Sequence, residues 1–170
     1  MKNEVLSRDY HRYGNKSEMP LFQKYLRKLQ ITPPPNKSLT FWNRIIYRVL
    51  CKINHIEITP NTQIGAGLYI GHAYGITINS AAILGENTNI HKGVTIGAEN
   101  RGKRQGAPVI GNNVWIGINS TIVGKVKIGN DVLIAPNSFV NTDVPDHSIV
   151  FGNPCIIKHK DSATEGYILT

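Results

Sequence analysis

The sequence predicts an all-β solenoid, a parallel β-helix, preceded by a short α-helical N-terminal segment. The first observation behind this prediction is a period of six in the aliphatic residues between Ile58 and Val140. An α-helix would repeat near every 3.6 residues, whereas a fixed period of six is typical of a parallel β-helix, in which three short strands form one coil. The second observation is the frequent Gly and Asn between these positions, since both residues tolerate the left-handed backbone of tight corners.

The aliphatic positions are expected to form the core. Each side chain should point into the coil and stack on the one three repeats later. The thirteen positions are Ile58, Ile64, Ile70, Ile76, Leu84, Ile90, Ile96, Ile110, Ile116, Ile122, Ile128, Ile134 and Val140.

Residues 1–55 are expected to form a basic α-helical cap. This segment holds eleven Lys/Arg and three Asp/Glu, whereas residues 56–170 hold eight of each, so the basic excess belongs to the N-terminal third. Apolar residues at helical spacing predict a helix from Ser17 to Gln30. Pro33-Pro34-Pro35 then interrupts the helical pattern, and a second helix is expected from Ser38 to about Asn54.

The second helix has two interpretations. We favour a cap that closes the open end of the solenoid, because solenoid ends need covering. The alternative is a basic amphipathic helix that contacts an anionic membrane, since Arg44, Arg48 and Lys52 lie four residues apart on one face.

The period is interrupted twice. From Ile76 to Leu84 the spacing is eight, which predicts a small slip in a turn. From Ile96 to Ile110 it is fourteen, and residues 98–108 offer no inward aliphatic side chain. These residues should therefore leave the coil as an extended loop, and loops of a solenoid commonly build its binding surface.

Composition narrows the class of protein. The chain has no apolar run long enough to span a bilayer and no secretory leader. Cys51 and Cys155 have no metal-binding or redox spacing. We therefore expect a cytoplasmic protein, membrane-peripheral at most, with no metal and no nucleic-acid partner. Residues 56–157 form the β-helix domain in this prediction, and residues 158–170 form a C-terminal tail.

Several motifs within residues 57–160 resemble the hexapeptide-repeat acyltransferases, and among them the serine acetyltransferase-like branch. The resemblance implies a left-handed β-helix and a homotrimer that uses acetyl-CoA, with active sites between subunits. The motifs are Gly71-His72-Ala73-Tyr74-Gly75, Gly93-Val94-Thr95-Ile96-Gly97, the loop that ends in Pro108, Val114-Trp115-Ile116-Gly117, Asp143-Val144-Pro145 and Gly152-Asn153-Pro154.

The family's catalytic histidine corresponds to His72, and its carboxylate partner, an Asp in serine acetyltransferases, corresponds to Glu57. An alcohol must lose its proton as it attacks a thioester, and a neutral imidazole can accept that proton at physiological pH. A carboxylate on the other ring nitrogen fixes the tautomer and stabilises the imidazolium. Backbone amides near Gly97 are expected to bind the developing oxyanion. His91 is interpreted as structural or as a subunit contact.

The resemblance also implies where acetyl-CoA binds. The donor should lie along one corner of the β-helix, where it contacts Ile118, Asn119, Pro136 and Asn137, largely through the backbone. Lys158 and Lys160 either meet the CoA phosphates or form a solvated basic tail, and the sequence leaves these two alternatives open.

The departures from the family pattern decide the predicted acceptor. Serine is a zwitterion, so a site that binds it needs charged side chains. At the positions where serine acetyltransferases carry such side chains, this chain has the uncharged residues Gly71, Gly106 and Ala107. We therefore predict that the acceptor is a saccharide or lipid-linked saccharide of surface polysaccharide (capsule or exopolysaccharide) biosynthesis, a reaction known in other relatives of this branch. Its contacts would be Tyr74 and, from the loop, Lys103 and Arg104. The alternatives are serine O-acetylation with a rearranged pocket and a non-catalytic trimeric scaffold.

Overall fold

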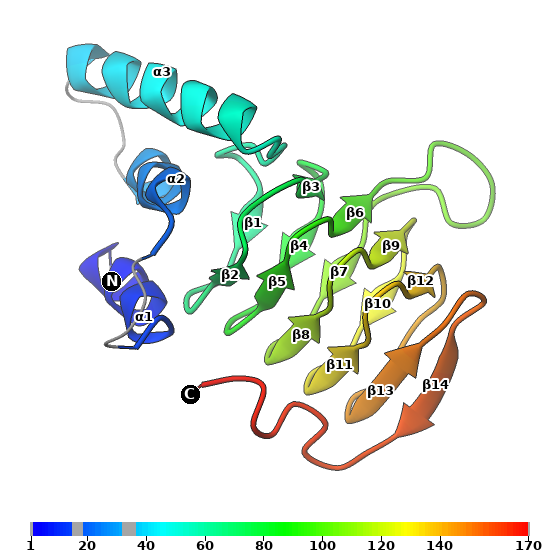
Figure 1. Ribbon diagram of the computed structural model, residues 1–170. Helices are drawn as coiled ribbons and strands as arrows, with labels where there is room; N and C mark the ends of the chain where they lie inside the picture. Colours follow the sequence, from blue (N-terminus) through cyan, green and yellow to red (C-terminus); the bar gives the residue numbers. More distant parts are fainter. Residues whose placement is uncertain (1, 15–18, 32–36, 170) are drawn as a thin grey trace.

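A computed structural model of the protein describes residues 2–14, 19–31 and 37–169. Within these ranges, helices α1 (Lys2–His11), α2 (Leu21–Ile31) and α3 (Lys37–Ile53) precede a β-helix. The helices lie against its first coil, and the strands then follow one another down the solenoid to the C-terminal hairpin (Figure 1).

The strands of the described chain form three sheets, one for each side of the coil. Their orders are β1-β4-β7-β10, β14-β13-β11-β8-β5-β2 and β12-β9-β6-β3, with every pairing parallel except β13 with β14. The strands are β1 (Gln63–Ile64), β2 (Tyr69–Gly71), β3 (Thr77–Ile78), β4 (Ile83–Leu84), β5 (Asn89–His91), β6 (Thr95–Gly97), β7 (Val109–Ile110), β8 (Val114–Ile116), β9 (Thr121–Val123), β10 (Lys127–Ile128), β11 (Val132–Ile134), β12 (Phe139–Val140), β13 (Ser148–Phe151) and β14 (Ile156–His159). The predicted left-handed parallel β-helix is confirmed.

The aliphatic stack forms the core, as the period of six predicts. Twelve of the thirteen positions are buried, and Ile64 is partly buried against the same cluster. The separation in sequence between stacked residues is not uniform, however. Ile116 pairs with Ile134 at a separation of 18 residues, whereas Ile70 pairs with Ile90 at 20 and Ile90 with Ile116 at 26.

These separations show where the residues beyond the regular 18 per coil are inserted. The prediction of a slip between Ile76 and Leu84 is wrong, because Ile78, not Ile76, stacks on Ile96. The spacing is therefore eight from Ile70 to Ile78 and six from Ile78 to Leu84, so the two extra residues lie in the turn after β2. The second insertion, eight residues, lies in the segment 98–108 between β6 and β7, which projects from the solenoid as a hairpin-like loop (Figure 1).

The helical region differs from its prediction in three details. Helix α1 is not predicted, because its mixed polar sequence shows no strong apolar period. Helix α2 begins at Leu21, and Ser17 and Pro33-Pro34-Pro35 lie outside the described residues. Ser38 lies inside α3, which starts at Lys37, so Ser38 is not its N-cap.

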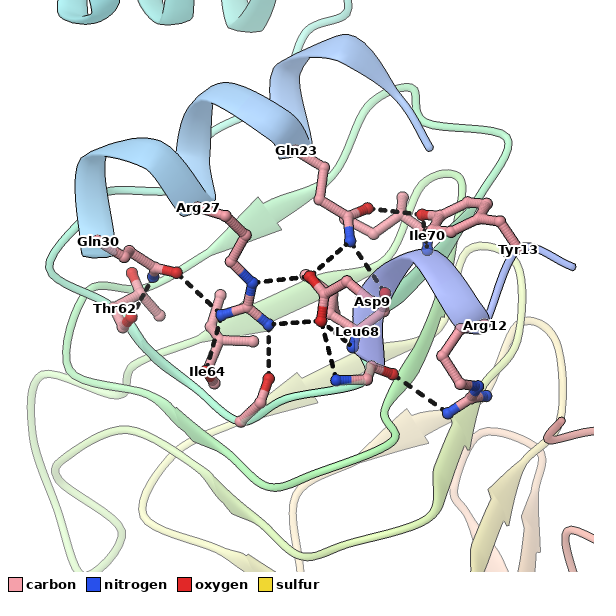
Figure 2. A network of polar contacts seen from close by, with 12 residues as sticks. Asp9, Arg12, Tyr13, Gln23, Arg27, Gln30, Thr62, Ile64, Leu68 and Ile70 are labelled. Carbon is pink, nitrogen blue, oxygen red and sulfur yellow. Dashed lines mark hydrogen bonds and ion pairs between the residues drawn. The ribbon is translucent and has the colours of Figure 1, made fainter. Parts of the chain in front are cut away.

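A buried polar network joins α1 and α2 to the first coil (Figure 2). At its centre Arg27 donates through Nε to Asp9 at 2.7 Å, and both side chains are almost completely buried. Asp9 also accepts hydrogen bonds from the backbone amides of Gly67 at 2.8 Å and Leu68 at 3.0 Å. The carboxylate therefore has both a charge partner and backbone donors, which is the condition for burying an ion pair without a large penalty.

The same network covers the open edge of the first coil. Arg27 donates to the carbonyls of Ile64 and Gly65, and Tyr13 accepts from the amide of Ile70 while its hydroxyl donates to Gln23. These backbone groups face the side on which no further coil stacks. Unpaired strand edges expose polar groups and invite aggregation. Here the side chains of α1, of Tyr13 just after it, and of α2 cover the edge in place of a further coil.

No helix in the part of the chain that the structure describes is long and apolar enough to cross a membrane.

We predict that Asp9→Ala lowers the free energy of unfolding by about 3–5 kcal/mol, because it leaves the buried Arg27 guanidinium without its counter-charge. Glu86→Gln is the matched control, since it removes a second contact of α1, the exposed pair of Arg8 with Glu86 at 2.9 Å. Exposed pairs contribute about 0–1 kcal/mol. Urea unfolding followed by circular dichroism measures both, and equal losses would contradict the proposed importance of the network.

Candidate active site

His72 lies in the turn that holds the two extra residues. It directly follows β2 and is exposed, with a backbone φ of 54°. Eight other non-glycine residues of the described chain share this left-handed conformation, so the φ angle marks a tight turn. The turn therefore presents the imidazole to solvent at a corner of the coil.

Glu57 lies beside this turn, at the entrance to the first coil. Its amide donates to the carbonyl of Ile76 at 2.8 Å, and it forms an isolated parallel bridge with Thr77. Nearby, the His55 and Tyr74 rings lie 5.2 Å apart. The structure thus brings the Glu57 segment and the His72 turn together. Within the described chain, no hydrogen bond joins their side chains and both are exposed, so the orienting role of Glu57 stays a prediction.

A cavity of about 1100 Å³ lies next to Glu57. Its β-helix wall includes Glu57 and Gly97. The predicted carboxylate and the backbone predicted to bind the oxyanion therefore border the same cavity. The facing wall comes from α3, through Arg44, Arg48 and Lys52. His72 and Tyr74 are not among the residues that line it.

The predicted acetyl-CoA contacts lie on one corner. The amide of Gly93 donates to Tyr74, that of Asn119 to Lys92, and that of Asn137 to Ile118, at 2.9–3.0 Å. Ile118, Asn119, Pro136 and Asn137 therefore continue the ladder that begins at the His72–Gly75 turn. An elongated ligand along this corner would end at His72, which is the arrangement that an acyl donor needs. Donor binding itself stays a prediction.

The remaining predicted residues are placed as follows. Tyr74 is exposed and contacts His55. Arg104 forms an ion pair with Glu99 at 3.2 Å, and Lys103 is exposed in the loop. Lys158 lies in β14, with its Nζ 5.7 Å from the centre of the Phe151 ring, and Lys160 follows the strand; both are exposed. Their roles stay predictions.

His91 explains one departure from the family pattern. It lies in register with Gly71 on the neighbouring strand, and a Cβ added to Gly71 would stand 2.6 Å from the His91 Nδ1. The ring of His91 lies 4.8 Å from that of Trp115. Burial lowers the pKa of His91, and the nearby His72 lowers it further. The His91 ring therefore fills the space beside Gly71, and a larger residue at position 71 would have to displace that ring.

Gly106 explains the second departure. Its φ of 131° belongs to a region that L side chains rarely adopt, and an added Cβ would stand 3.2 Å from the Cβ of Lys125. The loop closes here, since Glu99 and Gly106 exchange two backbone hydrogen bonds of 2.9 Å. An arginine at this position would therefore strain the loop, and its absence follows from the backbone.

Comparisons with known proteins agree with this fold. The family model "Bacterial transferase hexapeptide (six repeats)" matches residues 107–142. A serine acetyltransferase of Staphylococcus aureus strain Mu50 is 40% identical over 113 residues, which are 65% of this chain and 52% of that protein. A serine acetyltransferase of Staphylococcus xylosus is 38% identical over 125 residues, 72% of this chain and 57% of that protein. The crystal structure of Neisseria gonorrhoeae serine acetyltransferase in complex with serine has a TM-score of 0.71 and 28% identity, and the match covers 92% of this chain and 67% of that one.

These matches show what the chain is similar to. Its fold is a left-handed β-helix, residues 107–142 match the hexapeptide repeat of bacterial transferases, and its sequence is similar to that of serine acetyltransferases. It spans about half the length of the two staphylococcal relatives.

The prediction of a saccharide acceptor is contradicted, because these relatives are serine acetyltransferases. The prediction depended on finding no charged side chain at Gly71, Gly106 and Ala107. The structure shows why that test was too narrow. Gly71 and Gly106 follow from local packing and backbone geometry, so their lack of charge does not identify the acceptor, and charged side chains of α3 line the cavity.

The position of Arg44, Arg48 and Lys52 beside this cavity could not be predicted from the sequence. Their four-residue spacing is visible in the sequence, but it is equally compatible with an outward surface. Only the packing of α3, whose Tyr47 hydroxyl donates to the carbonyl of Ile58 at 2.5 Å, shows that this flank lines the cavity.

We predict that Gly71→Ala destabilises the protein by about 1–3 kcal/mol through overpacking against His91. In a His91→Ala background the same substitution should cost much less, because the space beside residue 71 is then open. Urea unfolding of the two single variants and the double variant measures this coupling. An equal cost of Gly71→Ala in both backgrounds would show that His91 does not determine the glycine.

Proposed function

We propose that the protein is an acetyl-CoA-dependent serine O-acetyltransferase. The observation that carries the proposal is the joint similarity in sequence and fold to serine acetyltransferases, one of them solved with serine. The proposal replaces the saccharide acceptor that the sequence alone favoured.

The proposed reaction uses His72 as the general base. The imidazole accepts the proton of the serine hydroxyl as the hydroxyl oxygen attacks the thioester carbonyl. A carbon–oxygen bond forms, the carbon–sulfur bond breaks, and the proton passes to the departing CoA thiolate. Glu57 would stabilise the imidazolium, and backbone amides near Gly97 would donate to the oxyanion. No acyl-enzyme is needed, so neither cysteine takes part.

The proposed assembly is a homotrimer with acetyl-CoA along the corner that carries Asn119 and Asn137. Support for the trimer comes from the hexapeptide repeat and from the geometry of the site. His72 and Glu57 are exposed, and a neighbouring β-helix against this corner would shield them from water. Lys158 and Lys160 are proposed to meet the CoA phosphates at the far end.

We predict that the purified protein releases CoA thiol from acetyl-CoA in the presence of L-serine. His72→Ala should lower kcat by roughly a hundred-fold or more, because it removes general-base assistance. Glu57→Gln should lower it less, since orientation is only part of the effect. His11→Ala, an exposed histidine at the end of α1, is the matched control. Near-normal turnover by His72→Ala would refute the assigned base, and no thiol release by the wild-type protein would favour a non-catalytic scaffold.

We predict that multi-angle light scattering gives a trimer in dilute solution. The hexapeptide repeat is typical of trimeric acetyltransferases, and the proposed active site lies between neighbouring subunits. A monomer would contradict the proposed active site between subunits. A hexamer would show that α1–α3 suffice to pair trimers.

A further inference from the structure

We infer that the basic flank of α3, formed by Arg44, Arg48 and Lys52, binds the α-carboxylate of the amino-acid acceptor. This inference deepens the proposed function and rests on it. It assigns the recognition of the substrate's negative charge to the helical cap, an element outside the β-helix and its loop.

The placement of these side chains is the first support. They follow one another at intervals of four residues, so they lie on one flank of α3, and all three line the cavity of about 1100 Å³. All are exposed, and among the described residues none has an ion pair or hydrogen bond through its side chain. Three unpaired cations beside one cavity raise the local concentration of anions.

The opposite wall completes the charge pattern. Glu57 is the acidic residue of this cavity, and Thr77, Asn79 and Gly97 lie on the same side. Positive charge on α3 therefore faces a carboxylate on the β-helix. Serine carries a carboxylate, so the basic flank offers it a charge partner that a neutral acceptor would not use. Arg44 and Arg48 suit the carboxylate best, because a guanidinium binds a carboxylate through two parallel hydrogen bonds.

The cations of the loop do not border this cavity. Gly106 and Ala107 are uncharged, and Arg104 is paired with Glu99. The residues that line the cavity do not include Arg101, Lys103 or Arg104. Within the described chain, α3 is therefore the source of positive charge beside Glu57 and Gly97.

The helix is also held firmly enough to orient a substrate. The Tyr47 hydroxyl donates to Ile58, and the amide of Ile56 donates to the carbonyl of Cys51 at 2.8 Å. Both bonds join α3 to the short segment that carries Glu57. The cationic and acidic walls are therefore positioned relative to each other before substrate binds, as an effective recognition site requires.

The phosphates of acetyl-CoA are a second source of negative charge. The predicted donor corner, however, carries Ile118, Asn119, Pro136 and Asn137, and none of these residues lines the cavity. The carboxylate of the acceptor is therefore the favoured anion, and the test separates the two sources through their Michaelis constants.

The test compares the wild-type protein with Arg44→Gln, Arg48→Gln and the double variant. We expect the double variant to raise the KM for L-serine by about ten-fold or more, the effect of losing hydrogen bonds to a charged group. Its kcat and its KM for acetyl-CoA should change little. L-Serinamide, which lacks the carboxylate, should be used equally well by both proteins.

Lys28→Gln is the matched control, because it removes one positive charge from α2 at a residue that does not line the cavity. It should leave the KM for serine unchanged, and circular dichroism should show that every variant is folded. An unchanged KM for serine in an active double variant would overturn this inference alone. A raised KM for acetyl-CoA instead would also overturn it and assign the arginines to the donor. Failure of the wild-type protein to acetylate serine would overturn the proposed function, and this inference with it.

Discussion

The rest of the structure depends on the fixed circumference of the aliphatic stack. An undisturbed coil takes 18 residues, as from Ile116 to Ile134, and each aliphatic side chain must meet the one beneath it. Additional residues cannot enter the core, so they leave at a corner. Such insertions at a corner occur twice. Two additional residues lengthen the turn that carries His72, and eight form the loop after Gly97. Both insertions border the candidate site, which is therefore built where the sequence departs from its own period.

This constraint explains how much of the molecule the sequence predicted. The core positions could be predicted because one physical requirement, inward stacking, acts on every sixth residue. The insertion near His72 was misplaced because Ile76 and Ile78 are both buried, and only the register with Ile96 distinguishes them. The outer layer carries no such period. Helix α1 depends on tertiary contacts such as those of Asp9 with the amides of Gly67 and Leu68, more than fifty positions away, which spacing along one sequence does not reveal.

The acceptor was misjudged for a related reason. Matching positions one by one assumes that a binding charge stays where it is in relatives. At residue 71 the ring of His91 fills the space, and at residue 106 the backbone excludes a side chain. A charge lost from the coil for such local reasons can return from another element, provided that the element is packed beside the same cavity. Helix α3 meets that condition through Tyr47, whereas its linear sequence shows only a basic stripe.

The cap consequently has two roles that share one set of contacts. The pair of Asp9 with Arg27 fixes α2 on the first coil, and α2 packs against α3. The cations beside the cavity are thus held by α3. Helix α3 packs on α2, and the buried ion pair anchors α2 to the first coil. Covering a solenoid end needs only polar groups that satisfy the exposed edge. A buried charged pair costs more than apolar packing, and we interpret its fixed hydrogen-bond partners as specifying one orientation of α2. That orientation places the basic flank of α3, although exposed, along the cavity.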